Sequence, residues 1–221
     1  MKALLVPALS CLLAACGGAD EALRPLVAEP VTMTDAVEAA GTGTHYARQQ
    51  LVQVPGRNVL VAEYVYDDFS HATEGRLDVF YLDASQGRVT GVERFERALE
   101  VGGQGRLGAW SIGDDFLGVP VVRASGGFTG QGQTMGCTVL VALMPEGPRR
   151  VASFGDFASN AGAALDPAEV EETSAAIEQI DPDRSFTVRY TGSETATVRF
   201  LWQGERFVPQ GELPFGTCDN G

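Results

Sequence analysis

The sequence predicts a mainly antiparallel β protein that folds as a sandwich or a strongly curved sheet around one core. Apolar and polar residues alternate with a period of two over 186–190 and again over 197–202. The turn residues Thr191–Glu194 separate these segments, which therefore form an antiparallel hairpin. The 27 glycines, spread between segments rich in Val, Thr and aromatic residues, indicate many short strands joined by turns.

Strand candidates precede this hairpin along most of the chain. Ser85-Gln86-Gly87 and Gly147-Pro148 are the plainest turns between neighbouring candidates. Gln203–Glu205 leads from the hairpin into a third strand, which makes a meander. The expected strands cover residues 58–66, 76–82, 88–95, 106–112, 116–123, 137–144, 149–154, 186–190, 197–202 and 206–208.

One capped α-helix is expected at about 167–180. Asp166-Pro167-Ala168-Glu169 combines an N-cap acid, a proline at the first helical position and an acid at the third. Ile177 and Ile180 belong to an apolar stripe that continues at helical spacing. Pro182 ends the pattern, because the residue before a proline is biased away from helical geometry.

A second, shorter helix is possible from Val31 to Ala40. Thr34 or Asp35 would lie near its start, and Gly41 would stop it. With no internal repeat and no low-complexity block, residues 32–221 are expected to form a single domain.

The first sixteen residues combine a positive start, a short apolar run and a small-residue cleavage site. Lys2 precedes Leu4–Leu13, which is shorter than the roughly 20 residues of a membrane-spanning helix. Leu13-Ala14-Ala15-Cys16 then resembles the lipobox of bacterial lipoproteins. The resemblance implies that residues 1–15 are a signal peptide and that Cys16 receives a diacylglycerol, which holds the protein to a membrane.

Two alternatives for this region stay open. Cleavage could precede Cys11, which would leave an apolar Leu12-Leu13 in the mature tail, or Cys16 could be a chance cysteine after an ordinary secretory signal. Gly17 is not aspartate, and by resemblance to Gram-negative lipoproteins this implies an outer-membrane protein that faces the periplasm. Residues 16–31 contain Gly, Ala, acids and two prolines, which are typical of a flexible tether.

Charge excludes several function classes. The precursor has a net charge of −13, and its only lysine is Lys2. The expected mature chain has 15 Arg, 29 acids and a net side-chain charge of −14. Binding of nucleic acid and polybasic contact with anionic lipid both need clustered cations, so neither is expected. A Schiff-base lysine, a Walker lysine and a Ser–Lys dyad are equally excluded from the mature chain.

Cys137 and Cys218 remain once Cys11 has left with the signal and Cys16 carries lipid. An even pair in an exported protein predicts a disulfide between them. The alternatives are a buried free Cys137 with a mobile Cys218, or a metal site. Two isolated cysteines lack the close spacing of structural zinc ligands, so no metal is expected.

No catalytic residue and no cofactor site are predicted. His45 and His71 are the candidate bases, and Ser70 lies beside His71, but adjacent side chains rarely meet at one point and no Gly-x-Ser-x-Gly elbow occurs. Residues 103–108 match G-x-G-x-x-G as a string. A strand pattern follows them instead of the helix that a dinucleotide site requires.

Other features have structural interpretations. Residues 125–136 are expected to form a long Gly-rich loop, in which Phe128 could stack on a ligand. Trp202–Pro209 resembles terminal hairpins of uncharacterised periplasmic lipoproteins and predicts an aromatic packed across a turn. Acidic pairs are expected at solvated turns and do not match a calcium loop; they are Asp67-Asp68, Asp114-Asp115 and Asp181/Asp183.

The leading functional hypothesis is a non-enzymatic envelope protein that binds or supports something, anchored through Cys16. One alternative is a periplasmic hydrolase that uses Ser70 or a carboxylate pair near His71. Another is an inhibitor or assembly accessory with a protein partner, which would present an exposed apolar patch or an unpaired edge strand.

Overall fold

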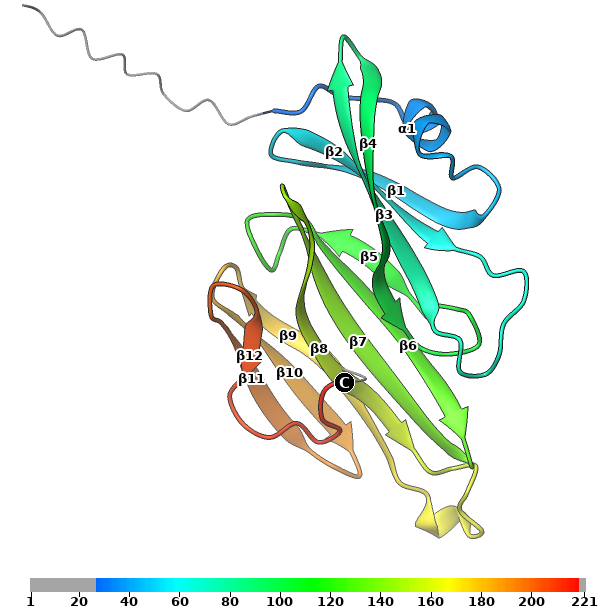
Figure 1. The fold of residues 1–221 in the computed structure, drawn as a ribbon. Helices are drawn as coiled ribbons and strands as arrows, with labels where there is room; N and C mark the ends of the chain where they lie inside the picture. Colours follow the sequence, from blue (N-terminus) through cyan, green and yellow to red (C-terminus); the bar gives the residue numbers. More distant parts are fainter. Residues whose placement is uncertain (1–26, 219–221) are drawn as a thin grey trace, which may run out of the picture.

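The computed structural model describes residues 27–218 as two antiparallel sheets and one α-helix, α1 (Figure 1). The predicted mainly-β class is confirmed. The expected signal peptide 1–15, Cys16 and most of the tether lie outside the described residues. Within 27–218, no helix combines the length and the apolar character needed to cross a bilayer.

The small sheet has four strands, and each strand pairs with its neighbour in the sequence. Gln86 and Gly87 have φ values of 54° and 72°, so the predicted turn there supplies the positive φ angles of a tight hairpin. The strands are β1 (Tyr46–Val54), β2 (Arg57–Tyr64), β3 (Gly75–Ser85) and β4 (Arg88–Val101).

The large sheet has eight strands, again in sequence order. Its strands β10, β11 and β12 form the predicted C-terminal meander. The strands are β5 (Trp110–Gly113), β6 (Val121–Gly130), β7 (Gln133–Met144), β8 (Gly147–Ser159), β9 (Glu172–Asp181), β10 (Ser185–Gly192), β11 (Ala196–Trp202) and β12 (Phe207–Pro209).

The large sheet is strongly curved, as the sequence suggests. β8 and β9 pair only between residues 157–159 and 172–174 and then diverge. The strands from β9 to β12 therefore fold back over one face of β6–β8, while the small sheet covers the other face (Figure 1). The result is three stacked β layers.

The apolar run Val139–Leu143 on β7 lies in the middle layer and is buried on both faces. Val139, Val141 and Leu143 pack against the small sheet, whereas Leu140 and Ala142 pack against the folded-back strands. A strand buried on both faces has a continuous apolar sequence instead of an alternating one, and this run has that character.

Helix α1 (Met33–Ala40) covers the outer face of the small sheet, where the possible short helix was placed. Thr32 is the N-cap, and its side chain accepts a hydrogen bond from the Asp35 N–H at 3.1 Å. Gly41 ends the helix in the left-handed region at a φ of 68°. Ala36 is fully buried in the apolar cluster that α1 forms with this sheet.

The helix expected at 167–180 is wrong. Its cap exists, because Asp166 Oδ1 accepts a hydrogen bond from the Ala168 N–H at 2.9 Å, but only a single 3-10 turn, Pro167–Glu169, follows. The next residues form β9, which pairs with β10. A bulge at Gln179, where φ is 49°, inserts one residue between the inward-facing Ile177 and Ile180. That insertion gives a strand the three-residue spacing of a helix.

The Gly-rich loop expected at 125–136 is also wrong. β6 and β7 pair through this region as far as Gly130 and Gln133, and only the intervening Gln131 and Gly132 form the turn. The glycines permit a close passage of backbone: a Cβ on Gly126 would lie 2.8 Å from the Cα of Gly102. The sequence therefore reflects a packed hairpin.

A polar cluster lies within the small sheet around Asp78, which is fully buried. Its carboxylate accepts hydrogen bonds from Arg76 Nε at 2.5 Å, Tyr46 Oη at 2.6 Å and Arg94 Nη2 at 3.2 Å. The Arg97 N–H, in a bulge of β4, donates to it at 2.9 Å. Burial alone would raise the pKa of Asp78, but these hydrogen bonds outweigh it and hold the pKa below its usual value.

The chain already contacts the small sheet before α1 begins. Ala28 is buried, and the Glu29 carbonyl accepts a hydrogen bond from Asn58 Nδ2 at 2.7 Å.

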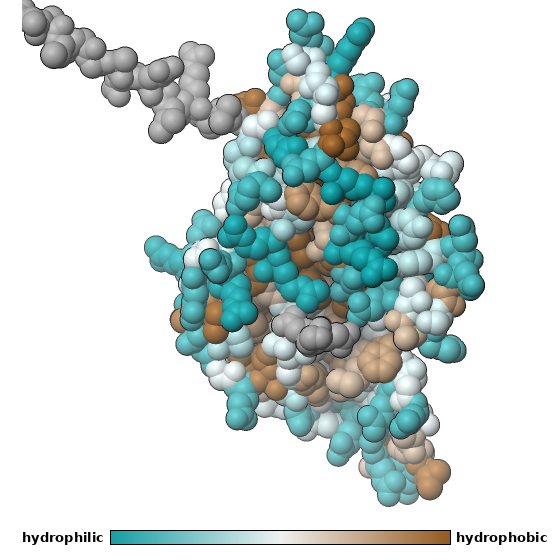
Figure 2. Space-filling view, viewed as in Figure 1, coloured by the Kyte–Doolittle hydropathy of each residue, from teal (hydrophilic) through white to brown (hydrophobic). Residues whose placement is uncertain are grey.

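On the face drawn in Figure 2, hydrophilic side chains predominate, in keeping with the acidic composition.

Candidate functional site

The candidate site is a groove of about 450 Å³ between strands β5 and β9 of the large sheet. Its walls are two runs of three consecutive residues: Ala109–Ser111, at the start of β5, and Ala175–Ile177 of β9. We call it the β5–β9 groove. Its floor comes from β6, β7 and β8 and consists of Arg123, Ser125, Thr138, Phe154 and Asp156.

Both walls are strand edges. β5 pairs only with β6, and beyond Ser174 the side of β9 away from β10 has no strand partner in the described chain. Side chains alternate along a strand, so three consecutive residues that line one groove present the backbone edge of that strand. The groove therefore exposes main-chain groups as well as side chains.

Arg123 supplies the cation of the groove. It lies opposite Ser111 in the β5–β6 register and is exposed. Among residues 27–218 its guanidinium has no ion pair or hydrogen bond. β5 itself is fixed to the small sheet through Trp110, whose Nε1 donates to Glu63 Oε2 at 3.1 Å. This contact holds one wall of the groove in place.

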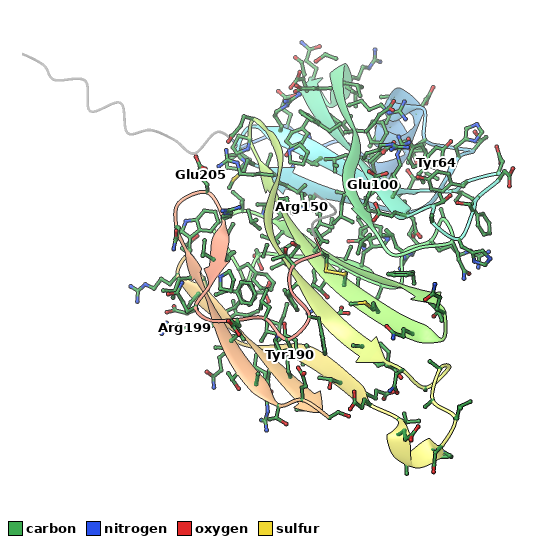
Figure 3. The ribbon with its side chains drawn as sticks, turned by 60° about the horizontal axis from the view of Figure 1, so that its bottom comes forward. Tyr64, Glu100, Arg150, Tyr190, Arg199 and Glu205 are labelled. Atoms are coloured by element: carbon green, nitrogen blue, oxygen red, sulfur yellow. A yellow bond between two sulfur atoms is a disulfide. The ribbon has the colours of Figure 1, made fainter. Side chains whose placement is uncertain are left out.

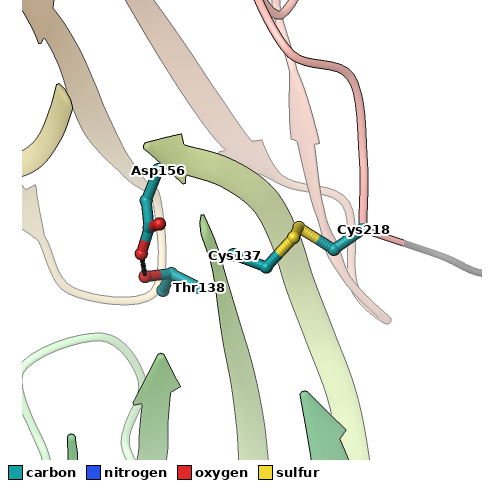
Figure 4. Close-up of a disulfide and its surroundings, with 4 residues drawn as sticks. All are labelled: Cys137, Thr138, Asp156 and Cys218. Atoms are coloured by element: carbon teal, nitrogen blue, oxygen red, sulfur yellow. Dashed lines mark hydrogen bonds between the residues drawn. A yellow bond between two sulfur atoms is a disulfide. The ribbon is translucent and has the colours of Figure 1, made fainter. Parts of the chain in front are cut away.

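Asp156 is the carboxyl group of the groove. Thr138 Oγ1 donates a hydrogen bond to its Oδ2 at 2.5 Å (Figure 4). Burial raises the pKa of Asp156, and the bond from Thr138 offsets only part of that effect. Gly136 makes room for this carboxylate, since a Cβ there would lie 2.5 Å from Asp156 Oδ1.

The raised pKa of Asp156 predicts a pH-dependent stability. A carboxyl whose pKa is higher in the folded state contributes stability below its unfolded pKa of about 3.9, and loses that contribution as pH rises through the folded value. Asp156→Asn has no carboxyl at this position and should not lose this stability. We therefore expect the melting temperature of Asp156→Asn, relative to that of wild type, to rise as pH increases from about 4 upward. Thermal melts of both proteins across pH measure the difference. A constant difference would contradict the prediction.

Tyr190, on β10, lies in the core between the folded-back strands and β6–β8. Its ring is fully buried, and its hydroxyl has no hydrogen-bond partner among the described residues. Burial, and secondly the negative charge of Asp156, raise the pKa of Tyr190 to about 12. Figure 3 shows Tyr190 in the large sheet, away from Tyr64 and Glu100 of the small sheet. The neutral hydroxyl is thus the state that this environment favours.

The predicted disulfide between Cys137 and Cys218 is present (Figure 4). It fixes the segment Leu213–Cys218, which we call the C-terminal strap, across the edge of β8. Within the strap, the Gly216 carbonyl accepts a hydrogen bond from the Gly155 N–H at 3.2 Å. The Phe215 ring packs against Tyr190 with centroids 5.7 Å apart. The strap therefore covers the edge that β8 presents where β9 diverges from it.

The candidate catalytic residues are not assembled into a dyad. Ser70 Oγ lies 3.1 Å from Thr73 Oγ1, so its hydrogen bond goes to threonine. His71 is exposed, and its carbonyl accepts from the Gln104 N–H at 3.3 Å. His45 lies before β1, and its carbonyl accepts from the Val65 N–H at 2.9 Å. The backbone carbonyls of both histidines thus form hydrogen bonds that hold loops in place.

The other sequence features have structural roles. Residues 103–108 form a turn that leads into β5 and not into a helix. Asp183 Oδ1 accepts from the Gly118 N–H at 2.9 Å, which ties the β9–β10 turn to the β5–β6 loop. Trp202 packs against Phe207 across the predicted turn, with ring centroids 5.0 Å apart. Phe128 is exposed on β6 and does not line the β5–β9 groove.

No group of three or more His, Cys, Asp or Glu side chains is placed to hold a metal ion within the described residues. Apart from Ser125, at the start of the expected Gly-rich loop, none of the groove residues belonged to a candidate site in the sequence. Arg123 and Thr138 were visible only as polar residues in predicted strands. The two walls of the groove could not be inferred, because they depend on the divergence of β8 and β9. A period-two pattern over Thr173, Ala175 and Ile177 was the one signal that could have revealed β9.

No family model, no curated protein and no solved structure matches this chain.

Proposed function

We propose that this chain is a lipid-anchored lipoprotein whose β domain is a non-enzymatic binding module, with the β5–β9 groove as its binding site. The observation that carries the proposal is the combination in one groove of an unpaired arginine, hydroxyl groups and two free strand edges. A groove of about 450 Å³ is within the size range of small-ligand sites.

The chemistry of the lining favours binding over catalysis. A nucleophile needs a base within hydrogen-bond reach. The hydroxyl of Thr138 donates to Asp156, whose raised pKa would suit a base, but Thr138 is buried with only 7% of its surface exposed. The buried position of Thr138 supports a role in which its hydrogen bond orients the Asp156 carboxyl group. Arg123, by contrast, is exposed and available to an anionic group.

A specific observation also favours the alternative of a protein that acts through its surface. The free edge of β9 is an unpaired strand edge, which is the feature expected of such an inhibitor or assembly accessory. This alternative uses the same groove, and it differs from the first in the size of the ligand.

The anchor is tested with Cys16→Ala in a Gram-negative host. We expect the wild-type protein to sediment with membranes and to carry the mass of added lipid. We expect Cys16→Ala to lose both, because acyl chains anchor by burying about 0.8 kcal/mol per methylene. Cys11→Ala is the matched control and should leave both unchanged. A wild-type mature protein without added mass would refute the lipid anchor.

Groove binding is tested by photo-crosslinking of the acylated protein in intact cells. A photoreactive amino acid at Ile177 should capture a ligand, whereas the same amino acid at Arg189, on an exposed part of β10, should not. Ser125→Trp, which fills the floor, should abolish the capture. Equal capture at both positions would contradict a groove-specific ligand.

A further inference from the structure

The backbone groups of β9 that face the β5–β9 groove can be assigned from the ladder. The Trp202 N–H donates to the Arg184 carbonyl, so even-numbered residues of β10 direct their backbone groups toward β11. Odd-numbered residues of β10 then pair with β9, and Arg189 pairs with Ala176. It follows that Ala175 and Ile177 direct their N–H and C=O groups away from β10, into the groove.

The pairing of β8 with β9 agrees with this assignment. β8 meets β9 at residues 172–174, and the Asn160 N–H donates to the carbonyl of Glu171, another odd-numbered residue. Four backbone groups on Ala175 and Ile177 are therefore left without a strand. The bulge at Gln179 ends this row.

Where β8 and β9 diverge, one of the two strand edges is covered and the other is open. The edge of β8 is covered by the C-terminal strap through Gly155 and Gly216. The edge of β9 faces the groove instead. Proteins normally cover, shorten or charge a free edge, because its backbone groups pair readily with another chain. An edge left open beside a shaped groove is a place for a strand to be added.

The charge of the groove selects the ligand. Arg123 and Asp156 are its only ionisable side chains. Arg123 is unpaired, and burial disfavours the charged form of Asp156. Within the groove, Arg123 is thus the side chain that can attract a negative group, and it also lines an adjoining pocket with Asp114 and Asp115. An arginine forms its strongest hydrogen bonds with carboxylates and phosphates.

We propose that the β5–β9 groove binds an extended peptide segment, which adds to the free edge of β9 as a strand and places a carboxylate against Arg123. This inference rests on the proposed binding function and names its ligand class. The free stretch from Ala175 to Glu178 matches a peptide of about four residues, or roughly 13 Å at 3.3 Å per residue. Main-chain hydrogen bonds supply affinity in this mode, and the carboxylate supplies selectivity.

The test uses full-length acylated protein in detergent micelles and a synthetic library of random octapeptides. We expect acidic peptides to be enriched and to bind with micromolar Kd. Arg123→Gln should weaken their binding at least tenfold, whereas Arg189→Gln, which removes the same charge from an exposed position outside the groove, should leave it within twofold. Acidic peptides that bind Arg123→Gln as tightly as wild type would overturn the role of the carboxylate.

Strand addition is tested with Ala175→Pro against Ala175→Ser. Proline removes the N–H that faces the groove and leaves the bonds of Ala176 to β10 in place, while serine keeps that N–H. We expect at least a tenfold loss for proline and less than a twofold change for serine. N-methylation of alternate peptide nitrogens should weaken binding equally. Circular dichroism confirms that both variants fold. Equal binding by both variants would overturn the proposal.

A parallel titration with succinate and with neutral disaccharides, followed by NMR of the groove amides, separates this inference from the proposed function. If these small molecules move the groove amides and no peptide is enriched, the peptide inference is wrong and the binding function stands. If neither kind of probe binds, both are wrong.

Discussion

Asp78→Asn should destabilise the domain by about 3–5 kcal/mol, because it removes the buried carboxylate and leaves the Arg76 guanidinium with the half-exposed Glu96, 3.4 Å away, as its remaining ion-pair partner among the described residues. Asp78 is fully buried, and only 9% of the Arg76 side chain is exposed. Asparagine keeps one acceptor oxygen, but its NH2 group would face the Tyr46 hydroxyl and the guanidinium groups of Arg76 and Arg94, which lose the acceptor oxygen that they share. For a domain of this length, the loss corresponds to a fall in melting temperature of roughly 10 °C. Differential scanning calorimetry measures it.

Arg94→Gln is the matched control, since Arg94 contacts the same carboxylate but its side chain is 44% exposed. A half-exposed ion pair contributes at most about 1 kcal/mol. If both variants lose the same stability, the burial argument is wrong.

Asp78→Asn should also change how the stability of the domain responds to acid. The pKa of Asp78 is below its usual value in the folded protein, so its stability contribution is present above about pH 4 and is lost as pH falls through the folded pKa. Asp78→Asn should remove this part of the acid destabilisation.

Loss of the disulfide should have an effect of similar size. Cys137 and Cys218 are 81 residues apart in the sequence, and closing a loop of that length stabilises by about 4 kcal/mol in the chain-entropy model. The double variant Cys137→Ser/Cys218→Ser should therefore unfold at a lower urea concentration. The freed strap should become sensitive to protease, because only the Gly155–Gly216 backbone hydrogen bond and the packing of Phe215 on Tyr190 would then be left to hold it among the contacts described above.

Reduction provides the control for this prediction. Dithiothreitol should lower the stability of wild type to that of the double variant and should leave the double variant unchanged. A double variant as stable as the oxidised wild type would show that the strap adds nothing to the fold.

The strand composition of the fold was predictable, because alternation and turn residues reflect local chemistry. The C-terminal meander and the Gln86-Gly87 turn follow from such patterns. β9 was not predictable by the same route. Its bulge at Gln179 brings Ile177 and Ile180 to one face, and a genuine cap at Asp166 precedes it. Tertiary pairing with β10 decides the outcome, and the short alternation over Thr173, Ala175 and Ile177 is the one local sign of it.

The candidate site was less predictable than the fold. The disulfide could be anticipated from two leftover cysteines, but the groove depends on where two paired strands separate. Arg123 and Asp156 are more than thirty residues apart and line one groove because β6, β7 and β8 pair side by side. Histidines and glycine runs are common in active sites, whereas the groove is lined by ordinary strand residues.

The strand order of the two sheets has a consequence for folding speed. Every ladder in the described chain joins strands that are neighbours in the sequence. Closing short loops costs little entropy, and proteins rich in local contacts fold faster than those that must pair distant strands. We expect each hairpin to serve as a template for the next in the order of synthesis, with the bond to Cys218 as the last step.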